Sequence, residues 1–206
     1  MALITPTEAR YALPGITDEA TLLNVLIDAV GHAFARKCGY PPATVGAAPT
    51  MESTSYTLDH DSIGGRDLLL RVTPATAITS VYDDAGLDFT DSTYLVPSTD
   101  YAIVEGRLLR LKSTATWGTW GVGSGRIRVA YTAGYVTVPA DLKNLARMAV
   151  KYLFELRRTQ GKASESSEGG GSVSYQDTAR GMGDRFDLPD YIMAGLGPYV
   201  LPGPMS

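Results

Sequence analysis

Residues 126–131 read Arg-Ile-Arg-Val-Ala-Tyr, and residues 139–158 read Pro-Ala-Asp-Leu-Lys-Asn-Leu-Ala-Arg-Met-Ala-Val-Lys-Tyr-Leu-Phe-Glu-Leu-Arg-Arg. In the first stretch apolar side chains alternate with charged or small ones, which predicts a strand with one buried face. In the second, apolar side chains recur at spacings of three and four behind a proline, which predicts a helix over residues 139–160. A strand that leads into a long amphipathic helix indicates an α+β fold.

The residues before this strand predict an antiparallel β region over about residues 50–135. Short segments rich in Val, Ile, Thr and Tyr alternate there with clusters of Gly, Asp and Pro, which is typical of strands and turns. Glu105-Gly106 separates two such segments closely enough for a tight hairpin. The expected strands are residues 53–58, 67–72, 78–82, 101–104, 107–111 and 126–131.

Two further helices are expected at the N-terminus, over residues 5–13 and 17–39. Thr5 and Glu8 have the spacing of a capping box, and Gly39 is a suitable helix stop before a proline pair. The long apolar stripes of helices 17–39 and 139–160 suggest that they pack together. The predicted fold class is therefore α+β: a helical bundle of two long helices plus short helices, with an inserted antiparallel β region and an extended C-terminal arm.

The C-terminal 45 or so residues change composition twice. Residues 162–172 are rich in Gly and Ser, which predicts a flexible linker. Residues 173–206 are dense in large apolar side chains, yet they are too few to build a core of their own. Such a segment either folds back on its own domain or reaches another chain, and both possibilities remain open at this point.

Composition limits the functions that the chain can have. Of its 206 residues, 44% are hydrophobic and 19% are charged, which predicts a packed globular protein. The net charge of −4 argues against a protein that grips nucleic acid through phosphates. The early acidic residues fit no signal peptide, and no apolar run is long enough to span a bilayer. We therefore expect a soluble protein made in a reducing cytoplasm, with Cys38 as a buried thiol that forms no disulfide.

No motif predicts a catalytic, cofactor-binding or metal site. Residues 59–64 resemble a calcium loop only superficially and are better explained as a hairpin turn. Residues 121–125 are glycine-rich but lack the lysine of a phosphate-binding loop. His32 and His60 have no nucleophile at a suitable spacing. The pair Asp83-Asp84 is expected to be a solvated part of a turn.

Several motifs, in this order, resemble those of the head-to-tail connector (adaptor) family of tailed bacteriophages. A strand ending in Tyr-Thr-Ala-Gly-Tyr at residues 131–135 precedes a proline-initiated helix, which closes on Phe154-Glu155-Leu156-Arg157. Phe154 departs from the Tyr or Trp-Tyr that is more usual in the family. Further similar segments are residues 5–10, 38–40, 188–192 and 197–199.

The resemblance implies a virion structural protein without enzymatic activity or cofactor. Connectors form a ring, commonly of twelve copies, beneath the portal, and they line the channel through which the genome passes. The C-terminal segment is expected to dock on the portal, and the β region to contact the next neck component or adjacent copies. This implies a connector domain over residues 1–161, the linker over 162–172 and a docking arm over 173–206, located in the virion and, during assembly, in the host cytoplasm.

Two groups of side chains are candidates for contacts with partners. Lys143, Arg147 and Lys151 are four residues apart and form a basic stripe, which is either a solvated helix face or a contact with neighbours or passing DNA. Trp117 and Trp120 flank the glycine-rich loop and either contact a partner or form a small cluster beneath the loop. The candidate anchors of the arm are Leu188, Tyr191, Ile192, Leu196 and Tyr199.

Three alternatives remain open on the sequence alone. Another neck or tail-completion protein, such as a tail terminator, would form rings on tail tubes. A small hydrolase that uses carboxylates would need a pocket lined by Asp and Glu with perturbed pKa values. A carbohydrate-binding β module based on Trp117 and Trp120 would leave the helices and the arm without a role.

Overall fold

The computed structural model describes residues 3–13, 20–159, 164–166, 172–174 and 188–202. These residues belong to two compact units, which are considered separately. The β unit comprises Ala35–Val138 with Tyr199–Ser206, and the helical unit comprises Ala2–Phe34 with Pro139–Pro198.

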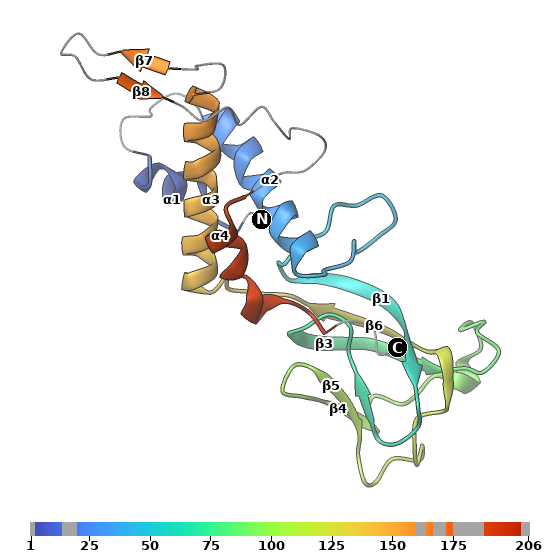
Figure 1. The fold of residues 1–206 in the computed structure, drawn as a ribbon. Coiled ribbons are helices and arrows are strands. Elements are labelled where there is room, and N and C mark those ends of the chain that lie inside the picture. The colour runs from blue at the N-terminus through green and yellow to red at the C-terminus, as the bar shows by residue number, and fades with distance from the viewer. Residues whose placement is uncertain (1–2, 14–19, 160–163, 167–171, 175–187, 203–206) are drawn as a thin grey trace. The chain divides into compact units, whose positions relative to one another are not determined.

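The β unit contains two three-stranded antiparallel sheets. In the first, β6 lies between β1 and β3 (Figure 1). In the second, β5 lies between β2 and β4. The central strand β6 alternates as its sequence predicts, with Ile127, Val129 and Tyr131 buried. The strands are β1 (Thr54–Ser62), β2 (Asp67–Leu69), β3 (Ala75–Asp83), β4 (Tyr101–Val104), β5 (Leu108–Leu111) and β6 (Gly123–Ala133), with a short 3-10 helix η1 (Ser92–Tyr94) after β3.

All six predicted strands are present, and the predicted hairpin is confirmed. Glu105 and Gly106 both have positive φ, at 53° and 64°, and the Arg107 N–H donates to the Val104 carbonyl at 3.1 Å. Two positive φ values are what the tight turn between antiparallel strands requires. The prediction of a turn at residues 59–64 is partly wrong, because β1 continues to Ser62 and alternates its burial to that point.

An aromatic cluster joins β1 to the core of the β unit. The ring of Tyr131 lies 6.2 Å from that of Tyr56 and 6.0 Å from that of His60. The Tyr131 hydroxyl accepts a hydrogen bond from the Val72 N–H at 3.0 Å. His60 is buried, and its Nε2 accepts from the Arg71 N–H at 3.3 Å, which leaves the proton on Nδ1 to be donated to Leu58 O at 3.0 Å. His60 is thus a structural side chain that, in its neutral form, connects β1 to the backbone at Arg71.

The end of β6 is fixed by Gly134, the glycine of the Tyr-Thr-Ala-Gly-Tyr segment. Gly134 has φ +104°, and a Cβ built on it would lie only 2.6 Å from the backbone carbon of Glu52. Its N–H donates to Pro74 O at 2.9 Å, and the next N–H, of Tyr135, donates to Met51 O at 2.9 Å. No side chain fits between these two backbones, so the close approach requires glycine.

The helical unit is built around α3 (Ala140–Thr159). The short helices α1 (Pro6–Tyr11) and α4 (Asp190–Ala194) pack against α3, and α2 (Ala20–Lys37) leaves this unit at Phe34 and continues into the β unit. The capping box predicted for α1 is confirmed, since Glu8 N–H donates to Thr5 Oγ1 and Glu8 Oε2 accepts from Thr5 N–H. The 3-10 helix η2 (Gly197–Tyr199) follows α4.

The predicted bundle of two long helices is wrong. Among the described residues only α2 and α3 are longer than six residues, and the rest of the regular structure consists of short helices and antiparallel sheets (Figure 1). The apolar stripe of α3, which includes Leu142, Ala146 and Ala149, is buried with the help of α1 and α4. A stripe of helical period predicts that a helix has a buried face, but it does not predict which element covers that face.

The predicted linker includes one short strand, and a second begins at its last residue and continues into the predicted arm. Ser164–Ser166 (β7) pairs antiparallel with Ser172–Ser174 (β8). Residues 162–163, 167–171, 175–187 and 203–206 of the predicted linker and arm lie outside the described residues. The domain boundaries at residues 161 and 172 stay predictions.

Candidate assembly surfaces

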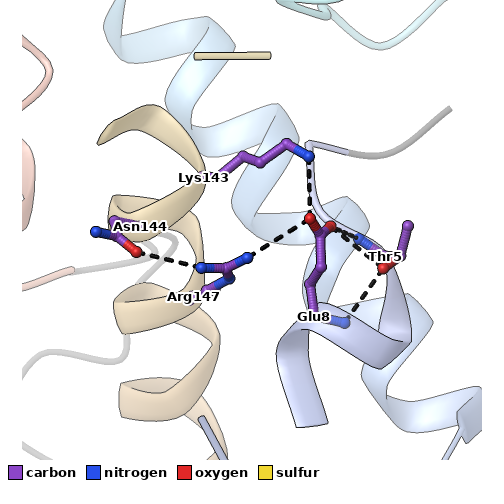
Figure 2. Close-up of polar contacts among 5 residues, drawn as sticks. All are labelled: Thr5, Glu8, Lys143, Asn144 and Arg147. Atoms are coloured by element: carbon purple, nitrogen blue, oxygen red, sulfur yellow. Dashed lines mark hydrogen bonds and ion pairs between the residues drawn. The ribbon is translucent and has the colours of Figure 1, made fainter. Parts of the chain in front are cut away.

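The basic stripe on α3 is held by an acidic residue of α1. Lys143 Nζ lies 2.9 Å from Glu8 Oε1, and Arg147 Nη2 lies 3.5 Å from the same oxygen (Figure 2). The other carboxylate oxygen of Glu8 accepts from the Thr5 N–H at 2.7 Å. Glu8 therefore caps its own helix and binds α1 to α3 at the same time.

The electrostatics of this contact favour a charged Glu8. The hydrogen bond from the Thr5 N–H, followed by that from Lys143, lowers the pKa of Glu8 to about 2. Two of the three basic side chains predicted to meet neighbours or DNA are thus engaged within their own unit. The third, Lys151, is half-exposed and lies 3.8 Å from Glu155 one turn later on α3.

Most candidate anchors of the arm are buried within this chain. Leu188, Ile192 and Leu196 are buried in the helical unit, whereas Tyr191 on α4 is 61% exposed. A Cβ on Gly195 would meet Leu145 Cδ2 of α3 at 2.8 Å, so α4 lies very close to α3. Of the four candidate anchors in this unit, Tyr191 alone is presented to solvent.

The residues after α4 return to the β unit. The Tyr199 ring packs edge-on against Tyr135 with centroids 5.8 Å apart. The Leu201 N–H donates to Cys38 O, at the end of α2, at 2.8 Å. Tyr199 and Leu201 are both buried, while Val200 between them is 51% exposed. We call residues 199–201 the C-terminal strap.

The two tryptophans have different environments. Trp120 is buried, its Nε1 donates to Arg66 O at 3.0 Å, and its backbone N–H donates to Gly65 O at 2.8 Å. Trp117 is partly exposed. Trp120 therefore connects its loop to the turn after β1, as the alternative of a cluster beneath the loop predicted, and Trp117 stays a candidate for a contact.

Sequence reasoning missed two buried carboxylates at the end of β3. Asp83 and Asp84 are 1% and 2% exposed, so the prediction that they are solvated is wrong. Asp83 accepts from the Gly121 N–H at 2.7 Å and from Arg126 Nε at 2.6 Å. Asp84 accepts from the N–H groups of Gly86, Asp88 and Phe89, and these bonds, that of Gly86 foremost, lower its pKa. No sequence signal indicated this role.

Burial shifts the pKa values of the His60 imidazole and the Cys38 thiol. Burial lowers the pKa of His60 to about 4 and raises that of the Cys38 thiol to about 11, which opposes formation of a nucleophilic thiolate.

Within the described ranges, no three His, Cys, Asp or Glu side chains are grouped so as to hold a metal ion. None of the described helices combines the length and the hydrophobicity that crossing a membrane demands.

Known structures share this fold, although no protein-family model and no curated protein sequence matches the chain. A chain in the virion of a native gene transfer agent particle has a TM-score of 0.55 and 15% identity, and the alignment covers 98% of this chain and 91% of that chain. A chain in the neck of an empty particle of this kind, computed with C6 symmetry, has a TM-score of 0.54 and 16% identity, covering 98% and 94%. At this level of identity the likeness concerns the fold.

Proposed function

We propose that this chain is a structural protein of the neck of a phage-like particle, where a ring of copies acts as the head-to-tail adaptor beneath the portal. The observation that carries the proposal is the fold, which matches a chain of a gene transfer agent neck over 98% of this chain. The order of the connector-like motifs in the sequence supports it independently. No group of described side chains favours the hydrolase alternative, because Asp83 and Asp84 are engaged by backbone N–H groups.

A ring of identical chains needs two different surfaces on each copy. In the helical unit, the outward faces of the two long helices differ: α2 exposes Val25, which is 60% accessible, and α3 exposes Met148, which is 42% accessible, beside Lys151. We infer that these two faces meet between adjacent copies. Twelve copies, the number that the connector resemblance implies, would be compatible with the C6 symmetry of the similar neck.

The charges suit a channel that DNA passes without binding tightly. Lys143 and Arg147 are offset by Glu8, and the chain carries a net charge of −4. Each phosphate contact made by a free Lys or Arg releases counterions and strengthens binding. A lining whose basic groups are already paired would therefore not hold the genome.

For the portal contact, we propose that Tyr191 is the anchor. It is the exposed member of the predicted set, and tyrosine is enriched among residues that dominate binding energy. Leu188, Ile192, Leu196 and Tyr199 would then act indirectly, by fixing α4 and the strap. The next neck or tail component would be met by another part of the ring.

The test is to mix the full chain with its portal ring and to measure the mass of the complex. We expect a stoichiometric ring-on-ring complex that Tyr191→Ala weakens roughly tenfold, as loss of one central anchor does. Val200→Ala is the matched control, because Val200 is also exposed. A deletion of the arm is less useful, since it would also uncover the surfaces that Ile192 and Leu201 bury. A chain that stays monomeric and ignores the portal would refute the proposal.

A further inference from the structure

Residues 188–201, which we call the C-terminal segment, pack against α3 in the helical unit. Ile192 and Leu196 of this segment are fully buried. A Cβ on Gly195 would lie only 2.8 Å from Leu145 Cδ2, so α4 and α3 are in van der Waals contact at this point. The apolar face of α3 is therefore covered by a part of the chain that follows it at a considerable distance in sequence.

The end of the same segment packs in the β unit, on the residues that follow α2. Leu201 is buried, and its N–H donates to Cys38 O at 2.8 Å. A Cβ on Gly39 would lie 3.9 Å from Leu201 Cβ, which is an ordinary packing distance. The segment thus contributes buried side chains to both units.

The connection between α3 and the C-terminal segment is much longer than this packing requires. Leu145 lies about 20 Å before the end of α3, so a return within the same chain needs about six extended residues. The chain supplies residues 160–187 instead. Ser164 pairs with Ser174 in β7 and β8, and the residues outside these paired strands can still span about 55 Å.

An excess of this kind indicates that the connection serves a more distant contact. Connections within compact domains have a median length of about 4–6 residues, and those above about 12–15 residues are usually functional segments or linkers. Residues 162–172 also have the Gly- and Ser-rich composition of a linker. The length of the connection therefore favours a C-terminal segment that reaches beyond its own chain.

A second copy of this chain offers the segment a site that it already fits. Every copy has the same α3 face and the same residues after α2, so an exchanged segment makes the contacts that it makes here. The axes of packed helices are about 8–10 Å apart, so α3 of a copy that packs alongside lies well within the reach of the connection. In a closed ring each copy gives one segment and receives one, and no site is left uncovered.

We propose that in the ring the C-terminal segment is exchanged, so that residues 188–201 of each chain pack on α3 and on the residues after α2 of the adjacent chain. This inference rests on the proposed ring of copies and deepens it by naming the element that links neighbours. The exchange adds a large contact to each interface between copies without exposing any apolar surface that the free chain buries.

A disulfide between α3 and the segment distinguishes exchange from packing within one chain. Leu145→Cys and Gly195→Cys are combined with Cys38→Ala, which removes the native thiol. Gly195 has φ −63°, which suits any residue, and shortening Leu145 makes room for the new side chain. The ring, alone and on the portal, is oxidised with diamide and analysed by electrophoresis without reductant. We expect the band of a single chain, 22.0 kDa, to give way to a ladder of two, three and more covalently joined chains.

The free monomer is the positive control, because its disulfide should form within one chain and leave the mass unchanged. Leu145→Cys/Val200→Cys is the matched control for random collisions, since Val200 belongs to the same segment but is exposed. Gly39→Cys/Leu201→Cys is a second pair, with Cβ atoms 3.9 Å apart, within the range of a disulfide. Cooperative unfolding of each reduced variant in urea shows that it is folded, and the second pair tests the exchange if the first does not fold.

The proposal is overturned if the assembled ring contains only disulfides within single chains. It is equally overturned if the ring contains no disulfide although the free monomer forms one, because the segment would then have left α3 for the portal. Either result leaves the ring, and with it the proposed function, standing. A chain that forms no ring at all would refute the proposed function and the exchange together.

Discussion

Substituting alanine for Gly134 is the sharpest test of how the β unit is held together. The new Cβ would overlap the backbone of residues 51 and 52, lying 2.6 Å from Glu52 C and 2.9 Å from Met51 O. Neither neighbour is a flexible side chain that can rotate away. The substitution must therefore separate the end of β6 from the segment before β1.

The expected loss follows from two contributions. A non-glycine residue at φ +104° costs about 1–2 kcal/mol in backbone strain. The separation also weakens the hydrogen bonds from Tyr135 N–H to Met51 O and from Ser53 N–H to Tyr135 O, at 2.9 and 3.1 Å, each of which contributes about 1 kcal/mol. Together these predict that Gly134→Ala lowers the free energy of unfolding by about 3–4 kcal/mol.

Urea denaturation followed by circular dichroism measures this change, and two other glycines provide controls. Gly46 also has positive φ, at +83°, but a Cβ there would meet nothing within 4 Å, so Gly46→Ala isolates the cost of φ. Gly197 has neither constraint, so Gly197→Ala should be nearly neutral. If Gly134→Ala costs no more than Gly46→Ala, the close approach of the two backbones is not what stabilises this region.

Three further predictions concern polar groups. Since His60 has a pKa of about 4 when folded and 6.5 when unfolded, the chain should lose up to about 3 kcal/mol between pH 6.5 and 4; a His60→Asn variant whose urea midpoint falls equally over this range would contradict this. Glu8→Gln keeps a capping side chain but loses the ion pair with Lys143, and should cost about 1 kcal/mol. This cost should decline as pH falls from 4.5 towards 2, where half of the folded chains carry a protonated Glu8, and urea melts at pH 7 and 2.5 would show whether most of it is lost. Tyr131→Phe leaves the buried Val72 N–H without its acceptor and should cost about 1–3 kcal/mol; a thermal midpoint unchanged from wild type would show that this hydrogen bond is dispensable.

Local chemistry made much of the fold predictable. The Val-, Ile-, Thr- and Tyr-rich composition of short segments between turn residues located all six strands, alternation identified the buried face of β6, and the Glu105-Gly106 pair specified its turn through positive φ. The capping box of Thr5 and Glu8 was predictable because both partners are within one helical turn. These features depend only on residues that are close in sequence.

The partners of these elements were not predictable in the same way. The helical bundle failed as a prediction because α3 is covered by α1 and α4, which come from opposite ends of the chain. Asp83 and Trp120 are buried, and backbone groups 38 and 54 residues away in sequence satisfy their polar atoms. Burial that depends on a partner tens of residues away leaves no periodic signal.

For the candidate contact residues too, local sequence identified the side chains but not their partners or their burial. Lys143 and Arg147 were identified as a stripe, but their partner Glu8 is more than 130 residues away in sequence. Among the candidates for the arm, composition indicated apolar anchors without indicating that Ile192 and Leu196 would be buried and Tyr191 exposed. The roles of these residues at a portal stay predictions.

The strap places Leu201 beside the chain's single cysteine. Because the Cys38 side chain is fully buried and Leu201 hydrogen-bonds to its carbonyl, a thiol reagent reaches it only when the structure around it opens. The rate of alkylation of one sulfur atom then reports how often the structure around Cys38 opens, without any engineered label. The same reaction, followed through assembly, would show whether assembly makes this region open more or less often.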